Sequence, residues 1–147
     1  EAMTAANRVV EIFDAPRERV WRAWTQPSTM ARWLHPHGLR TPAETVSVDL
    51  RVGGVFRFTM IDSVGTAFTS GGEYLELREP ELLRCTWGSP DASVAEIEVL
   101  LTEMEQMHTR MRFVLRADAH ADDAHSMKTG WREAISELGR EMGEIHG

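Results

Sequence analysis

The sequence predicts an α+β protein in which a curved antiparallel sheet of about six or seven strands wraps a long C-terminal helix, with two short helices after the first strand. Three observations predict this. A β-branched segment near the N-terminus is followed by two short helical patterns. Apolar and polar residues then alternate with period 2 from residue 44 to 116, and the last segment carries an apolar stripe at helical spacing. The length of 147 residues suits one domain over residues 1–147.

The N-terminal elements are a strand and two helices. Residues 6–13, ANRVVEIF, are typical of a strand. In the following stretch, DAPRERVWRAWTQPSTMARWL, apolar side chains recur on one helical face. Asp14 and Ser28 are candidate N-caps, and Pro27 separates the two helices. Pro36 ends the second helix.

The middle of the chain predicts strands joined by short connections, which favours antiparallel neighbours. The segments are residues 46–50, 56–60, 72–78, 82–87, 93–102 and 108–116. Gly53 and Gly54 lie between the first two of them. A phosphate-binding loop would open a helix and carry a lysine, whereas the segment after these glycines alternates as a strand. We therefore interpret the pair as a tight turn of the sheet.

The final segment predicts one long amphipathic helix. Its apolar residues follow at spacings of 4, 4, 3, 4 and 3, and are Met127, Trp131, Ile135, Leu138, Met142 and Ile145. This helix is the only large element able to cover the apolar face of the sheet. Because a straight helix and a curved sheet do not mesh along their whole length, we expect a mostly apolar cavity between them.

The expected cavity is lined by inward residues of the strands and helices. We assign to it Trp33, Phe56, Phe58, Tyr74, Trp87, Met111, Phe113, Trp131 and Ile135. The alternative for all of them is a plain aromatic core. Trp131 is the strongest single candidate, and Tyr74, the only tyrosine, could orient a polar group of a ligand.

Composition limits the classes of partner that the protein can bind. The net charge of −7 argues against nucleic-acid binding and against docking on anionic membranes. No apolar run is long enough to span a membrane, so we expect no membrane insertion. Cys85 is the only cysteine, which excludes an intrachain disulfide and a cysteine zinc cluster and favours a cytoplasmic location.

Several motifs together resemble one family. They are APRERVWRAWTQPSTMARWLHP, VSVDLRVGGVFRFTM, GGEYLEL with LLRCTW, and the GW pair that opens the final helix. In this order they resemble the family named for the activator of the 90-kDa heat-shock-protein ATPase, within the START-like, or helix-grip, superfamily. The resemblance runs from about residue 9 to residue 143. It implies a helix-grip fold around a hydrophobic cavity, while relatives range from lipid and hormone binders to cyclases and chaperone regulators.

The histidine pattern of this sequence gives only weak support for a metal site. His35 and His37 form an H-x-H pair, whose side chains would point the same way on an extended segment. His120 or His125 could supply a third ligand. Pro36 between the pair and the lack of a fixed third partner favour solvated loop histidines, and we assign no metal site.

Other polar candidates have plain structural alternatives. Asp49 is interpreted as a surface ion-pair partner and not as a catalytic acid. Arg110, Arg112 and Arg132 could hold an anionic head group, but alternation places the first two outside the sheet. Cys85 is expected to be a small apolar filler.

We predict from these observations a protein that binds a small hydrophobic molecule, lipid-like or aromatic. One alternative is a cyclase or hydrolase acting on an aromatic or polyketide substrate in the same cavity, which would need converging ionisable groups. Another is a chaperone-regulating or dimeric interaction module, which would need an exposed apolar patch. We assign no catalytic residue and no cofactor, and we leave a homodimer open.

Overall fold

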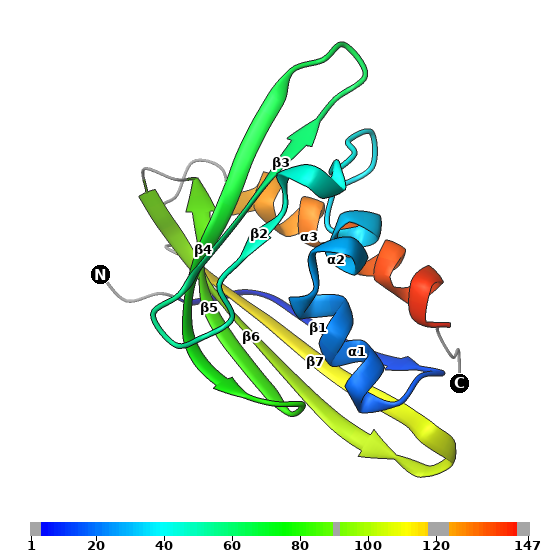
Figure 1. Cartoon of the computed structure of the whole chain (residues 1–147). Coiled ribbons are helices and arrows are strands. Elements are labelled where there is room, and N and C mark those ends of the chain that lie inside the picture. Colours follow the sequence, from blue (N-terminus) through cyan, green and yellow to red (C-terminus); the bar gives the residue numbers. More distant parts are fainter. Residues whose placement is uncertain (1–3, 90–91, 118–123, 144–147) are drawn as a thin grey trace.

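The computed structural model describes residues 4–89, 92–117 and 124–143 (Figure 1). Its strands are β1 (Thr4–Phe13), β2 (Ser47–Val48), β3 (Val55–Ile61), β4 (Ala67–Arg78), β5 (Leu82–Ser89), β6 (Ala92–Met104) and β7 (His108–Ala117). Its α-helices are α1 (Arg17–Thr25), α2 (Pro27–Trp33) and α3 (Ala124–Met142). Two single-turn 3₁₀ helices are η1 (Ala43–Thr45) and η2 (Glu105–Met107).

All seven strands form one antiparallel sheet in the order β1-β7-β6-β5-β4-β3-β2. The strands from β2 to β7 follow one another as a meander, and β1 completes the sheet beside β7. The three helices lie on the same side of the curved sheet, and the β3–β4 hairpin extends beyond them (Figure 1). This arrangement confirms the predicted α+β architecture. None of the helices in the described ranges is long and apolar enough to cross a membrane.

The core lies between the sheet and the helices. The inward side chains of β7 are fully buried, as Met111 and Phe113 show, and α3 turns Trp131, Ile135 and Leu138 onto them. Each of these side chains gains roughly 1.5–3 kcal/mol from leaving water. The predicted apolar stripe of α3 is therefore its buried face as far as Met142. Its last member, Ile145, lies outside the described residues.

Aromatic rings form a connected cluster through this core. The ring centroids of Trp24 and Trp131 are 5.9 Å apart, and those of Trp131 and Trp87 are 4.8 Å apart. Trp87 in turn lies 5.5 Å from Phe58 and 6.2 Å from Phe56. These separations are typical of attractive aromatic pairs. The cluster thus links α1, α3, β5 and β3 in one packed unit.

The N-terminal helices are positioned by prolines and backbone bonds instead of the predicted caps. Pro16 and Gln26 are the N-cap residues of α1 and α2, and neither uses a side-chain cap. Asp14 and Ser28 are therefore not caps. Pro27 begins α2, where its fixed φ and missing N–H cost nothing. The backbone N–H of Asp14 instead donates to the Gly143 carbonyl, which ties β1 to the end of α3.

Two strand boundaries differ from the prediction. The strand predicted over residues 46–50 is only Ser47–Val48, and Leu50, placed on the inward face by alternation, is 43% exposed. The chain turns early because the Gly54 N–H donates to the Arg51 carbonyl. β4, in contrast, starts at Ala67, five residues before the predicted strand at residue 72.

The glycine pair is a turn, as predicted. Gly53 has φ +86°, a conformation that favours glycine, and a Cβ on Gly54 would run into the Asp49 carbonyl oxygen. The Gly53 N–H donates to the Tyr74 carbonyl, and the Tyr74 N–H donates to the Gly54 carbonyl. The turn therefore fixes Tyr74 in the neighbouring strand β4.

Candidate functional site

An open groove lies between the β3–β4 side of the sheet, the segment after α2 and the first half of α3. Its volume is about 480 Å³. It is lined by Leu34, His35, Pro36, Leu39, Phe58, Met60, Phe68, Thr69, Ser70, Trp87, Gly88, Ser89, Ser126, Met127, Gly130, Trp131 and Ala134. This volume is in the usual range for sites that take small organic ligands. The groove therefore has room for such a molecule.

The groove exists because elements diverge at this end of the molecule. Phe58 and Met60 alternate on β3 and line one wall, while Met127 and Trp131 line the α3 side. Gly130 lies between them on α3, and a Cβ there would meet only Pro36, at an ordinary contact distance of 3.8 Å. Lack of a side chain at Gly130 thus leaves space that the helix could otherwise fill.

The lining is apolar at its base and hydroxylic at its edges. Thr69 and Ser70 on β4, Ser89 on β5 and Ser126 on α3 supply hydroxyl groups. His35 is the only ionisable side chain among the residues that line the groove. A site of this composition can bury an apolar ligand and hydrogen-bond a polar part of it. Among the described residues of the lining, no second ionisable side chain lies beside His35.

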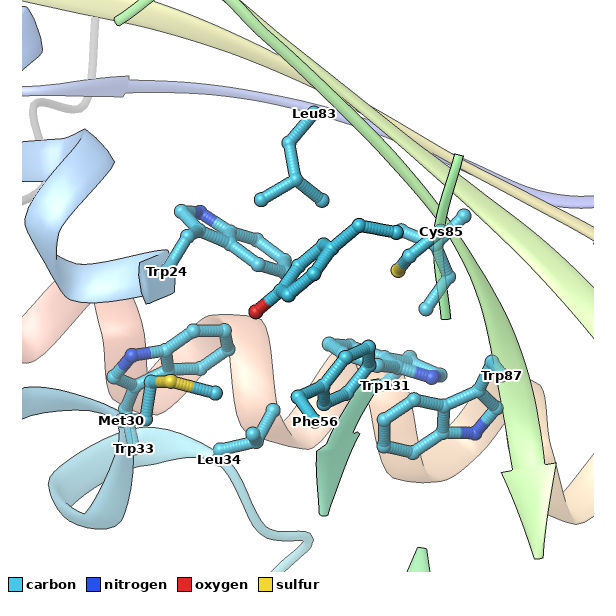
Figure 2. A pocket seen from close by; sticks show the side chains of 11 residues that line it. Trp24, Met30, Trp33, Leu34, Phe56, Leu83, Cys85, Trp87 and Trp131 are labelled. Atoms are coloured by element: carbon cyan, nitrogen blue, oxygen red, sulfur yellow. The ribbon is translucent and has the colours of Figure 1, made fainter. Parts of the chain in front are cut away.

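A second, much smaller cavity of about 20 Å³ lies deeper in the core (Figure 2). It is lined by Trp24, Met30, Trp33, Leu34, Phe56, Tyr74, Leu83, Cys85, Trp87, Ile97 and Trp131. This volume is enough for about one water-sized group. Leu34, Trp87 and Trp131 line both this inner cavity and the groove, so they form the partition between the two.

Burial controls the two titratable groups of the inner cavity. Loss of hydration raises the pKa of the Cys85 thiol to about 12, with a smaller contribution from Glu96. Loss of hydration also raises the pKa of the Tyr74 phenol, followed by the effects of Cys85 and Asp49. Both groups are therefore neutral at physiological pH.

The predicted lining residues separate into three groups. Trp33, Phe56, Tyr74, Trp87 and Trp131 line the inner cavity. Phe58 lines the groove, together with Trp87 and Trp131. Met111, Phe113 and Ile135 line neither space and are packed in the core. A ligand-binding role for the first two groups stays a prediction.

Several groove residues were not predicted. Phe68, Thr69 and Ser70 lie in the first part of β4, ahead of the strand predicted to start at residue 72. Met60 continues the alternation of Phe56 and Phe58, so that pattern could have placed it. The serines and Leu39 carry no local signal, because only the tertiary fold brings their segments together.

The two histidines of the H-x-H pair have different surroundings. His35 lines the groove, whereas the His37 imidazole lies 3.8 Å from Glu133 and 3.5 Å from Glu137 of α3. The backbone N–H of His37 also donates to the Glu133 carboxylate at 2.9 Å. No group of three or more ligating side chains suited to a metal occurs in the described part of the chain. His120 and the side chain of His125 lie outside it.

The remaining candidates are on the surface. Asp49 pairs on the surface with Arg51, two residues along the chain, at 2.9 Å. Arg110, Arg112 and Arg132 are exposed, and Arg112 lies 3.8 Å from Glu98 on the outer face of the sheet. None of these arginines lines the groove or the inner cavity.

Comparison with protein families gives a match over nearly the whole chain. The model of the family described as activator of Hsp90 ATPase homolog 1-like protein matches residues 14–143. The chain belongs to this family. A comparison with curated proteins found no match.

Solved structures of several proteins have the same fold. Protein CV1439 from Chromobacterium violaceum is 27% identical, with a TM-score of 0.80 over 92% of this chain and 95% of that one. Protein NE0264 from Nitrosomonas europaea is 22% identical, with a TM-score of 0.78 over 92% of both chains. An HSP90 activator from Plasmodium falciparum is 18% identical, with a TM-score of 0.71 over 95% of this chain and 96% of that one. The helix-grip fold is therefore that of the family.

Proposed function

We propose that the protein binds a small, mostly apolar molecule in the groove beside α3. The observation that carries the proposal is the groove itself, with its volume of about 480 Å³ and its largely apolar lining. Phe68 is 47% exposed at its edge although it is a large aromatic residue. Covering such side chains stabilises a complex by roughly 25 cal/mol per Å² before ordering costs are subtracted.

The composition of the groove favours binding over acid–base catalysis. In the part of the lining that the structure describes, His35 is the only ionisable side chain, and no second acid or base lies beside it. A cyclase or hydrolase would need at least one more such group near the substrate. Binding without chemistry is therefore the better-supported function for this site.

The test is a substitution on α3 whose new side chain fills the groove. In Gly130→Leu the new side chain starts from a Cβ that has only ordinary contact with Pro36, so the helix accepts it and the side chain extends into the groove. We expect the wild type to enhance the fluorescence of N-phenyl-1-naphthylamine and Gly130→Leu to lose this binding by tenfold or more. Ser136→Leu, on an exposed position of the same helix, is the matched control and should bind like the wild type.

Two results would contradict the proposal. One is the absence of any saturable binding of the probe to the wild type. The other is equal binding by wild type, Gly130→Leu and Ser136→Leu, which would place the probe elsewhere. As a separate measurement, native mass spectrometry of protein purified from its own host would identify the natural ligand through a co-purifying mass.

A second candidate function is regulation of an Hsp90-type chaperone. It is supported by the family description and by the exposed apolar residues of the β2–β3 turn, where Leu50, Val52 and Val55 are 43%, 61% and 42% exposed. The measurement is the ATPase rate of the host chaperone with and without the protein. This candidate predicts stimulation that Val52→Ser weakens, whereas an unchanged ATPase rate rejects it.

A further inference from the structure

The hydroxyl group of Tyr74 is buried and has no hydrogen-bond partner among the described residues. Tyr74 is only 2% exposed, and its side chain is one of those that line the inner cavity. Buried tyrosine hydroxyls usually have a partner, because an unpaired one forfeits its hydration. The turn at Gly53 and Gly54 holds the Tyr74 backbone from both its N–H and its carbonyl, so the residue is fixed in place.

The inner cavity suits one small polar group. Tyr74 is the only one of its eleven lining residues with a side-chain oxygen. The volume of about 20 Å³ accepts a single water-sized group and no ring. The indole N–H of Trp33 already donates to the Ala23 carbonyl at 2.8 Å, whereas the buried indole nitrogens of Trp24 and Trp131, which also line the cavity, have no partner among the described residues.

Of the three residues that form the partition, Trp87 is the least buried. Trp131 and Leu34 are each 4% exposed and fixed in the core, whereas Trp87 is only partly buried. The register of β5 against β6 shifts between Trp87 and Gly88, so the regular pairing of the two strands is interrupted beside Trp87. Figure 2 shows Trp87 beside Trp131 along one side of the inner cavity.

We infer that the groove ligand is an uncharged molecule whose apolar body ends in a carbonyl or hydroxyl oxygen, and that this oxygen passes Trp87 to bind the Tyr74 hydroxyl. The inference rests on the proposed function, because it assigns the chemical class of the same ligand. Tyr74 donates its O–H to the ligand oxygen, and the apolar body stays in the groove. The groove thus holds the apolar body of the ligand, and the inner cavity is the head-group site that holds its oxygen.

The charges around both spaces select against an ionised ligand. No lysine or arginine is among the described residues that line them, and His35 is the one ionisable side chain described in the groove lining. A carboxylate or phosphate pushed into the inner cavity would lose its hydration without gaining a cation. A ketone or alcohol exchanges one hydrogen bond to water for one to Tyr74 and avoids this cost.

The test uses the fact that the chain has a single tyrosine. Protein labelled with ¹³C at tyrosine Cζ gives one resonance, whose shift reports hydrogen bonding of the phenol. We expect 2-octanone to move this resonance and to compete with N-phenyl-1-naphthylamine, and octanoate to bind at least tenfold more weakly. Tyr74→Phe should bind 2-octanone about three- to tenfold more weakly while it keeps its affinity for the oxygen-free fluorescent probe.

Each outcome decides between the two proposals. Tyr74→Phe removes an unpaired buried hydroxyl, so it should fold with unchanged or higher thermal stability. If the fluorescent probe and 2-octanone bind but the resonance stays in place and Tyr74→Phe changes nothing, the head-group site is wrong and the groove function stands. Octanoate binding as tightly as 2-octanone also overturns it. If neither the probe nor the ketone binds, the groove function itself fails and the inference falls with it.

Discussion

At the scale of single residues, Cys85 shows how burial decides chemistry. The thiol is 3% exposed on β5 and faces the inner cavity wall instead of solvent. Its sulfur is therefore a packing atom, as the sequence predicted, since reactive thiols need exposure and a lowered pKa. The same burial makes Cys85 a contributor to the alkaline sensitivity of the fold.

We expect the free energy of unfolding to fall as pH rises above about 8.5, the usual pKa of a thiol in an unfolded chain. The unfolded chain then releases the Cys85 proton, whereas the folded protein keeps it until a pH of about 12. The stabilisation is complete below the lower value and is lost toward the higher one. Urea midpoints measured between pH 8 and pH 11 should fall more steeply for the wild type than for Cys85→Ala. Parallel curves for the two proteins would contradict this assignment.

At the scale of elements, the hairpin between β6 and β7 contains the most strained turn of the described residues. Gln106 and Met107 both have positive φ, at 61° and 63°, although neither is a glycine. Such a conformation costs an L-residue roughly 1–2 kcal/mol. Met107 is also 62% exposed, so its side chain contributes little packing in return.

Met107→Gly should therefore stabilise the protein. The gain from relieving the backbone exceeds the entropy that glycine adds to the unfolded chain, and we expect a net increase of up to about 1 kcal/mol. Met104→Gly is the control, because Met104 is also exposed but has the extended backbone of a strand, with φ −120°. It should lose up to about 1 kcal/mol. Thermal or urea unfolding of both variants checks the pair, and a destabilised Met107→Gly would refute the strain argument.

The elements were predictable where one periodic pattern runs without interruption. The stripe of α3 and the alternation of β7 are of this kind, and both were placed correctly. β2 was too long in the prediction because alternation at Val46, Val48 and Leu50 continues past the point where the backbone turns. The first part of β4 was missed because it is exposed on a projecting hairpin and so lacks an apolar face.

At the scale of the whole molecule, the sequence predicted a space between sheet and helix but not its position. Most of the interface is filled, since Met111 and Phe113 of β7 and Ile135 of α3 are buried in the same core cluster. The open space lies at one end, where α3 begins and the β3–β4 hairpin leaves the body of the molecule. Alternation tells which residues face inward, but it does not tell where two surfaces diverge, because this depends on the curvature of the sheet.

This position has a consequence for how stability is distributed along α3. Its second half is held by buried side chains at Ile135, Leu138 and Met142, and by a bond from the Arg19 guanidinium to the Glu141 carbonyl. The first described turns, from Ser126 to Gly130, are exposed or half-buried and border the groove. Segments with few buried contacts open locally more often than the core does.

We therefore predict that amide hydrogen exchange is faster over residues 126–130 than over residues 134–142. A groove ligand such as 2-octanone should slow exchange over residues 126–130 and in the facing part of β4, residues 68–70, while residues 134–142 stay unchanged. Binding to the folded state alone also raises global stability by RT ln(1 + [L]/Kd), which is about 2.7 kcal/mol at a ligand concentration of 100 Kd. In Gly130→Leu the new side chain occupies the same space, so this variant should show slow exchange at residues 126–130 without ligand. Uniform protection along α3, or a ligand effect confined to its second half, would mean that ligands enter the fold by another route.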